Sequence, residues 1–168
     1  MILEDLYKKT EYEMFDDYFK RIHKLLPSWP EEIIKEWLFR ENSCIEKYFF
    51  LGFDRFEFDL VEWENEEILS KVESSAMKSV DNMGAQFFEH PTETYLKKYI
   101  KVNKTWPSPI IILENINEIK KNSWNEIRNP FHLLEGHLRL GYIRFLIKNH
   151  PEKLNKKHLL YIAKIKRA

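Results

Sequence analysis

The sequence predicts an α+β fold, and three observations carry that prediction. Apolar residues recur at helical spacing over much of the first 39 residues. Residues 56–60 alternate between apolar and acidic side chains, as a half-buried strand does, whereas the run 110–113 is wholly aliphatic, as a buried strand is. Helical and strand patterns then follow one another without regular alternation, which indicates α+β rather than a parallel α/β sheet.

Composition excludes several classes of protein. The chain has 168 residues, 27 basic and 27 acidic side chains, and 43% hydrophobic residues, so it can bury a substantial core. The single cysteine, Cys44, excludes an internal disulfide framework and a cysteine-cluster zinc site. No apolar run is long enough for a membrane span, and the N-terminus lacks the order of a secretory signal. We therefore expect a cytoplasmic protein with no membrane partner.

The first part of the chain predicts a helical hairpin followed by β structure. Residues 3–26 have the spacing of one amphipathic helix, which Pro27 ends. A capping box over 28–31, from Ser28 to Glu31, should start a second helix that runs to Phe39. We assign residues 1–45 to an N-terminal helical extension, and residues 46–168 to the main domain. That domain opens with β pattern over 48–63, in which residues 52–55 form a turn before the alternating strand, and continues with a short helix from residue 65.

The remaining elements follow from local patterns. Residues 74–91 contain Ser, Asn and Gly and predict a long loop of the kind that carries function. Thr92 should cap the next helix, whose expected core face is Tyr95, Leu96, Tyr99 and Ile100. Strands are predicted at 110–113, 131–134 and 158–165, with a helix at 137–148 between the last two.

The charges are unevenly distributed along the chain. Residues 1–84 carry 20 acids and 11 bases, and residues 85–168 carry 7 acids and 16 bases. A basic half favours a phosphorylated small ligand or an acidic partner, while overall neutrality argues against broad coating of nucleic acid. The alternative is that the two halves attract each other within the fold.

The stretch that carries chemistry is Glu135-Gly136-His137-Leu138-Arg139, in which a strand ends at a carboxylate, turns at glycine and enters a helix at once. The start of a helix exposes unpaired N–H groups and partial positive charge, which suits an anion. Arg139 could hold that anion bidentately, and His137 adds a titratable donor. Basic side chains at this end oppose the helix dipole, so an anionic ligand would resolve the conflict.

Each of these residues also has a purely structural interpretation. Gly136 could be a turn residue, Glu135 a cap, and His137 a surface residue without a task. Arg139 could pair with Glu135 or with another acid. Short motifs of this kind match by chance, so both interpretations stay open on the residues alone.

The arrangement as a whole resembles the ParB/sulfiredoxin-like superfamily. The segments that carry the resemblance are a helix at 95–100, the Pro-Ile strand at 109–113, the strand–Gly–helix motif at 131–139 and the closing strand at 159–163. The form Glu-Gly-His-x-Arg is most similar to that of the small ParB-like proteins and free-serine kinases. The resemblance implies an α+β fold with a ParB/sulfiredoxin-like mixed sheet over residues 46–168.

The resemblance also implies nucleotide handling. Gly136, His137 and Arg139 would bind phosphate, and Glu135 would hold Mg²⁺ or act as a base, with Glu135 and His137 as the catalytic pair. ATP, ADP or CTP with Mg²⁺ are the candidate cofactors, in a phosphotransferase or nucleotide hydrolase. The alternative is a non-catalytic regulator, antitoxin-like, phage-encoded or defence-associated, that binds a protein partner through its N-terminal helices, including Trp29 and Trp37.

Three departures from the family narrow these expectations. No cysteine stands beside the motif, so sulfinic acid reduction is not expected, and no helix-turn-helix follows it, so sequence-specific DNA binding is not expected either. A second phosphate motif has no clear counterpart. Lys78, Gln86 and Lys97 are the nearest substitutes, and they leave triphosphate binding in question.

Overall fold

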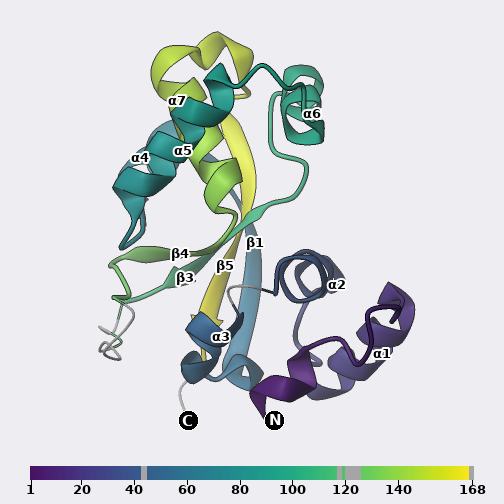
Figure 1. Cartoon of the computed structure of the whole chain (residues 1–168). Coiled ribbons are helices and arrows are strands. Elements are labelled where there is room, and N and C mark those ends of the chain that lie inside the picture. Colours follow the sequence, from purple (N-terminus) through teal and green to yellow (C-terminus); the bar gives the residue numbers. More distant parts are fainter. Residues whose placement is uncertain (43–44, 117–118, 120–125, 167–168) are drawn as a thin grey trace. The chain divides into compact units, whose positions relative to one another are not determined.

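A computed structural model describes residues 1–42, 45–116, 119 and 126–166 (Figure 1). The chain forms two compact units, one of Met1–Asp59 with Ala163–Ala168, the other of Leu60–Ile162. Strands β1 (Phe56–Glu64) and β5 (Lys157–Ile165) run from one unit into the other. The expected domain boundary after residue 45 stays a prediction, and Cys44 lies outside the described residues.

The first unit is mainly helical. Its elements in chain order are η1 (Leu3–Leu6), α1 (Phe15–Leu25), α2 (Glu31–Ile33), the π-helix η2 (Ile34–Arg40), α3 (Ile45–Tyr48) and the 3₁₀ turns η4 (Phe49–Leu51) and η5 (Phe53–Arg55). The predicted second helix is confirmed as α2 and η2. The β pattern expected from residue 48 is wrong over 48–51, where short helical turns stand instead. The turn expected over 52–55 is confirmed, since the Arg55 N–H donates to the Gly52 carbonyl and β1 begins at Phe56.

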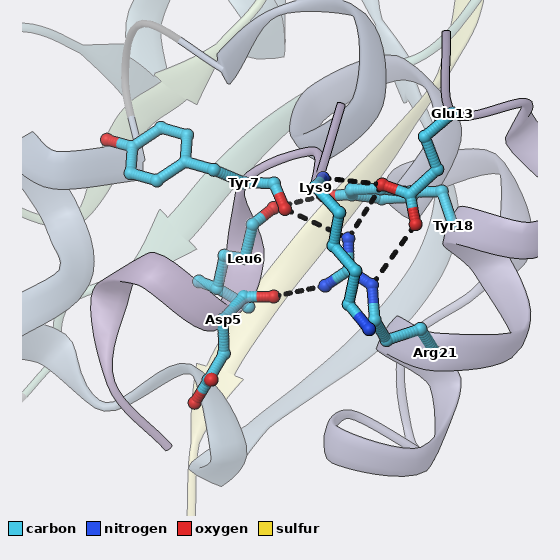
Figure 2. A network of polar contacts seen from close by, with 7 residues as sticks. All are labelled: Asp5, Leu6, Tyr7, Lys9, Glu13, Tyr18 and Arg21. Carbon is cyan, nitrogen blue, oxygen red and sulfur yellow. Dashed lines mark hydrogen bonds and ion pairs between the residues drawn. The ribbon is translucent and has the colours of Figure 1, made fainter. Parts of the chain in front are cut away.

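Arg21 organises the N-terminal residues of this unit (Figure 2). Its guanidinium donates to both Glu13 carboxylate oxygens and to the backbone carbonyls of Asp5 and Tyr7. The Tyr18 hydroxyl donates to the Leu6 carbonyl at 2.5 Å. The predicted single helix over 3–26 is therefore wrong, since these side chains bind carbonyl groups that a continuous helix would use internally.

The core of the first unit is aromatic. Trp29 and Trp37 stack with ring centroids 5.5 Å apart, and Phe53 contacts both rings. The Trp29 indole N–H donates to the Phe53 carbonyl at 2.9 Å. The predicted capping box is wrong, because Ser28 donates instead to the Phe56 carbonyl and Pro30 occupies the N-cap without a side-chain bond. These contacts bring Trp29, Trp37 and Phe53 into one aromatic core.

The five strands of the described residues form one mixed sheet in the order β1-β5-β3-β4-β2. The second unit adds α4 (Asn65–Lys71), β2 (Val72–Glu73), α5 (Met77–Glu89), α6 (Tyr95–Asn103), β3 (Ile110–Glu114), β4 (Phe131–Glu135), α7 (His137–Asn149) and η6 (Pro151–Lys153). Strand β4 runs parallel to β2 and antiparallel to β3. The short helix from residue 65, the three later strands and the helix after Gly136 were all predicted and are confirmed.

The predicted loop over 74–91 is wrong, because most of it is the 13-residue helix α5. Helices α5 and α7 lie side by side (Figure 1) and cross at two glycines. A Cβ on Gly84 would lie 2.0 Å from the Gly141 carbonyl oxygen, and one on Gly141 would lie 2.3 Å from the Val80 carbonyl oxygen. Close helix packing therefore explains a glycine that, in the sequence, indicates a loop.

Helix α6 is capped by Thr94, whose hydroxyl accepts from the Lys97 N–H, and not by Thr92 as predicted. Lys97 is buried, and its ammonium donates to the carbonyls of Phe88 and His90 at the end of α5. A cation is favourable beside the C-terminal carbonyls of a helix. Lys97 therefore fastens α6 to α5.

Several ion pairs join an acid of residues 1–84 to a base of residues 85–168. Asp81 pairs with Arg144 and Lys148, Lys164 pairs with Asp59, and Lys166 pairs with Glu57. Some acids of the first half of the sequence thus pair with bases of the second half, as expected if the two halves attract each other within the fold. Within the described residues, no helix combines the length and apolarity that crossing a membrane requires.

Candidate functional site

The candidate site is the corner between β4 and α7. Strand β4 is buried from His132 to Glu135, and Gly136 follows it with φ +99° as the N-cap of α7. L-residues rarely adopt this φ, and a Cβ at Gly136 would lie 2.6 Å from Ile110 Cγ2. Both the backbone angle and the neighbouring side chain therefore require glycine, as the motif predicted for a sharp turn.

At this corner Arg139 is paired with Glu135. The Arg139 Nη2, from the first turn of α7, donates to Oε2 of Glu135 at the end of β4, and the two side chains are only 14% and 9% exposed. The Glu135 carboxylate is thus buried and engaged by a guanidinium, which is one of the two roles that the sequence left open for Arg139. His137 is half-buried in the first turn of α7.

Comparison with two other largely buried arginines distinguishes Arg139. Arg144 donates through Nε and Nη2 to both oxygens of Asp81, at 2.7 and 3.2 Å, and through Nη1 to the Leu69 carbonyl. Arg21 likewise has partners for all three of its nitrogen atoms. In contrast, Arg139 Nε is buried without a hydrogen-bond partner among the described residues. A buried donor without a partner costs about 1–3 kcal/mol, so this atom calls for an explanation.

The first turn of α7 contains no acidic side chain. The first N–H groups of a helix lack intrahelical partners and attract an anion. The corner therefore combines a helix start, a constrained glycine and a guanidinium with a spare donor. Chemically, this arrangement can bind an oxyanion such as phosphate, provided that the anion shares or replaces Glu135 as the partner of Arg139.

The three residues that could replace a second phosphate motif, Lys78, Gln86 and Lys97, do not form a common site. Lys97 is buried in its contacts with α5 carbonyls, whereas Lys78 and Gln86 are exposed on α5. Among the described residues, no group of three His, Cys, Asp or Glu side chains could hold a metal ion. A surface hollow of about 490 Å³ is lined by Lys8, Lys9, Thr10 and Glu11, in the other unit, and includes none of the predicted site residues.

Two histidines of the second unit are structural. His132 is buried on β4, and its Nδ1 accepts from the Arg128 N–H at 3.1 Å, as expected for a strand histidine. His158, which the sequence did not single out, is buried on β5 with Nδ1 2.7 Å from the Thr105 hydroxyl. Burial lowers the pKa of His158 to about 4, so its ring is neutral at physiological pH.

A comparison with known protein families, a search of curated proteins and a search of solved structures each found no match. The geometry of the corner therefore carries the functional argument.

Proposed function

We propose that this protein binds the phosphate group of a nucleotide or similar small molecule at the start of α7. The observation that carries the proposal is Arg139, whose Nε is buried beside a helix start and lacks the partner that the comparable nitrogen has in Arg21 and Arg144. A phosphate oxygen at this atom would satisfy it. The same ligand would also meet the partial positive charge at the start of α7.

Glu135 competes with an incoming phosphate for Arg139. Its carboxylate already accepts from Arg139 Nη2, so an incoming phosphate meets a buried negative charge at close range. Binding therefore needs either a rotation of Glu135 away from Arg139 or a cation that offsets the two negative charges. Because phosphate presents more charge and more acceptor oxygens than a carboxylate, it is the stronger competitor for a guanidinium.

The ParB/sulfiredoxin-like assignment belongs to the same proposal. It is supported by the chain order of a buried strand, a glycine with positive φ, a helix with Arg in its first turn and the closing strand β5. ATP, ADP and CTP are the nucleotides that this resemblance puts forward. Glu135 alone, paired with Arg139, does not fit a resident Mg²⁺ ion, so we assign no step to a metal.

Calorimetric titration with ATP, ADP, CTP, GTP and pyrophosphate, with and without Mg²⁺, tests the proposal. We expect at least one of these ligands to bind, and Arg139→Gln to weaken that binding by at least ten-fold, the loss of one charge-assisted hydrogen bond. Arg40→Gln is the matched control, because Arg40 also pairs with a glutamate one turn away, Glu36, but on an exposed surface. Absence of binding across the whole set, or equal effects of the two substitutions, would refute it.

A second candidate function is a non-catalytic regulator that keeps the fold. The observation that favours it is the engagement of Glu135, since its carboxylate is buried and already accepts from the Arg139 guanidinium. Measurement of phosphate release and transfer from bound nucleotide separates the two. Turnover that Glu135→Gln abolishes would indicate a phosphotransferase or hydrolase, whereas binding without turnover would indicate a regulator.

A protein partner of such a regulator would not contact the tryptophans of the N-terminal helices. Trp29 and Trp37 are 2% and 0% exposed and belong to the core. Tyr12 and Met14, which precede α1, are 88% and 71% exposed and are the most exposed of the large apolar side chains there. Trp29→Ala would therefore abolish a complex only by unfolding this unit, while Tyr12→Ala tests contact directly.

A further inference from the structure

Helix α6 presents an aromatic face to solvent. Tyr95 and Val102 are 72% and 79% exposed, and Tyr99 lies half-buried between them at helical spacing. The Tyr95 and Tyr99 ring centroids are 5.9 Å apart, with the planes tilted by 51°. On the opposite side of α6, Lys97 and Ile100 are buried. The sequence had placed both tyrosines in the core, so for Tyr95 that prediction is wrong.

Lysines lie on this aromatic face and at its C-terminal end. Lys98 lies three residues after Tyr95 on the same side of the helix, and Lys104 follows the end of α6. The turn after η6 adds another, because Asn155 donates to the Lys104 carbonyl at 2.9 Å and thereby holds Lys156 near that end. Among the described residues, none of these three lysines forms an ion pair with an acidic side chain, whereas Lys101 pairs with Glu93.

We infer that this surface, the α6 face of Tyr95, Lys98, Tyr99, Lys104 and Lys156, binds single-stranded nucleic acid. Exposed aromatic rings interleaved with cations are what such strands require, since each base can stack on a ring while its phosphate contacts a lysine. A duplex keeps its bases stacked internally and could use only the lysines. An acidic polypeptide would likewise leave the tyrosine rings without a role.

This inference is independent of the phosphate site at α7. It also differs from sequence-specific recognition of DNA, because stacking on tyrosine tolerates any base and the lysines contact only the backbone. The chain as a whole is neutral, so binding should be confined to this local surface and should depend strongly on salt.

Fluorescence anisotropy of the full chain with labelled oligo(dT) and oligo(U) of about 15 nucleotides, in the range of such binding sites, tests the inference. We expect binding at low salt, with a slope of log K against log[salt] of about −2 for three phosphate contacts. Tyr95→Ala should weaken binding by about ten-fold through lost stacking. Lys98→Gln should weaken it and reduce the slope by about 0.7.

Matched controls come from the other unit. Tyr12→Ala removes another highly exposed tyrosine, and Lys20→Gln another exposed lysine, and both should bind like the unaltered protein. Because Tyr95 is exposed, its substitution should leave the thermal unfolding midpoint unchanged, which shows that the fold is kept. No binding of either strand at low salt, equal affinity of the Tyr95→Ala variant, or equal affinity for a labelled oligoglutamate peptide would each overturn the inference.

Discussion

The close crossing of α5 and α7 makes Gly84→Ala a sharp test of the structure. The added Cβ would lie 2.0 Å from the Gly141 carbonyl oxygen, 2.2 Å from its carbonyl carbon and 2.9 Å from the Tyr142 nitrogen. All three are backbone atoms, which cannot rotate away as the end of a side chain can. The two helices must therefore move apart by about 1 Å or more before ordinary contact is restored.

Two effects of opposite sign compete in this substitution. Alanine gains about 1 kcal/mol over glycine as a helix former. Overpacking costs typically about 1–3 kcal/mol, and a clash between two backbones belongs at or above the upper end of that range. The packing cost should dominate, with a net loss of about 2 kcal/mol in the free energy of unfolding. For a chain of this size the midpoint of thermal unfolding should fall by roughly 4–8 °C.

Thermal and urea unfolding followed by circular dichroism measure this effect. Ser79→Ala, on an exposed position of the same helix, is the control, and should leave the midpoint unchanged or raise it slightly. Gly141→Ala should destabilise comparably, because its Cβ would lie 2.3 Å from the Val80 carbonyl oxygen. The double variant should lose less than the sum, since one separation of the helices relieves both clashes. A Gly84→Ala protein as stable as the unaltered one would refute the crossing.

Three further predictions follow from buried groups in the second unit. The pKa of His158 is lowered to about 4 in the folded protein, below its usual 6.5, so the unfolded chain binds the extra proton first. Stability should therefore fall by up to about 3 kcal/mol as pH drops from about 6.5 to about 4, and His158→Gln should remove this dependence in urea unfolding. Gly136→Ala should lower stability by about 1–3 kcal/mol through its φ of +99° and its contact with Ile110, measured in the same way. Asp81→Asn should lower the free energy of unfolding by about 2 kcal/mol, because the buried Arg144 loses its charged partner. It should also remove the part of the acid destabilisation that comes from the lowered pKa of Asp81. An unchanged urea midpoint would contradict that role.

Local patterns were sufficient where an element is defined by its own residues. The aliphatic run of β3 and the strand–glycine–helix order of β4 and α7 lie where the sequence put them. Helix α5 departs from the predicted loop although Val80, Gly84 and Phe87 follow helical spacing, because the Ser, Asn and Gly residues of this segment are typical of loops. Its packing against α7 offsets the poor helix propensity of these residues.

The candidate site was only partly accessible from sequence. Glu135, Gly136, His137 and Arg139 are neighbours along the chain, so their proximity needed no tertiary structure. Glu135 was one of several partners that the sequence allowed for Arg139. The contact of Gly136 with Ile110 could not be predicted, because Ile110 belongs to a strand more than 20 residues earlier in the chain. That Arg139 Nε lacks a hydrogen-bond partner can be seen only in the tertiary structure, in contrast to Arg144, whose three nitrogen atoms all have partners.

The amino-acid sequence by itself determined strands β3, β4 and β5, the turn at Gly136 and the helix that carries Arg139, because periodicity and backbone freedom are properties of neighbouring residues. Only the tertiary structure decided that α5 packs closely on α7 through Gly84, that Tyr95 faces solvent and that Arg139 keeps a donor without a partner. Those outcomes depend on contacts between residues far apart in sequence. The free energy of such contacts exceeds the small local preferences that a sequence pattern reports.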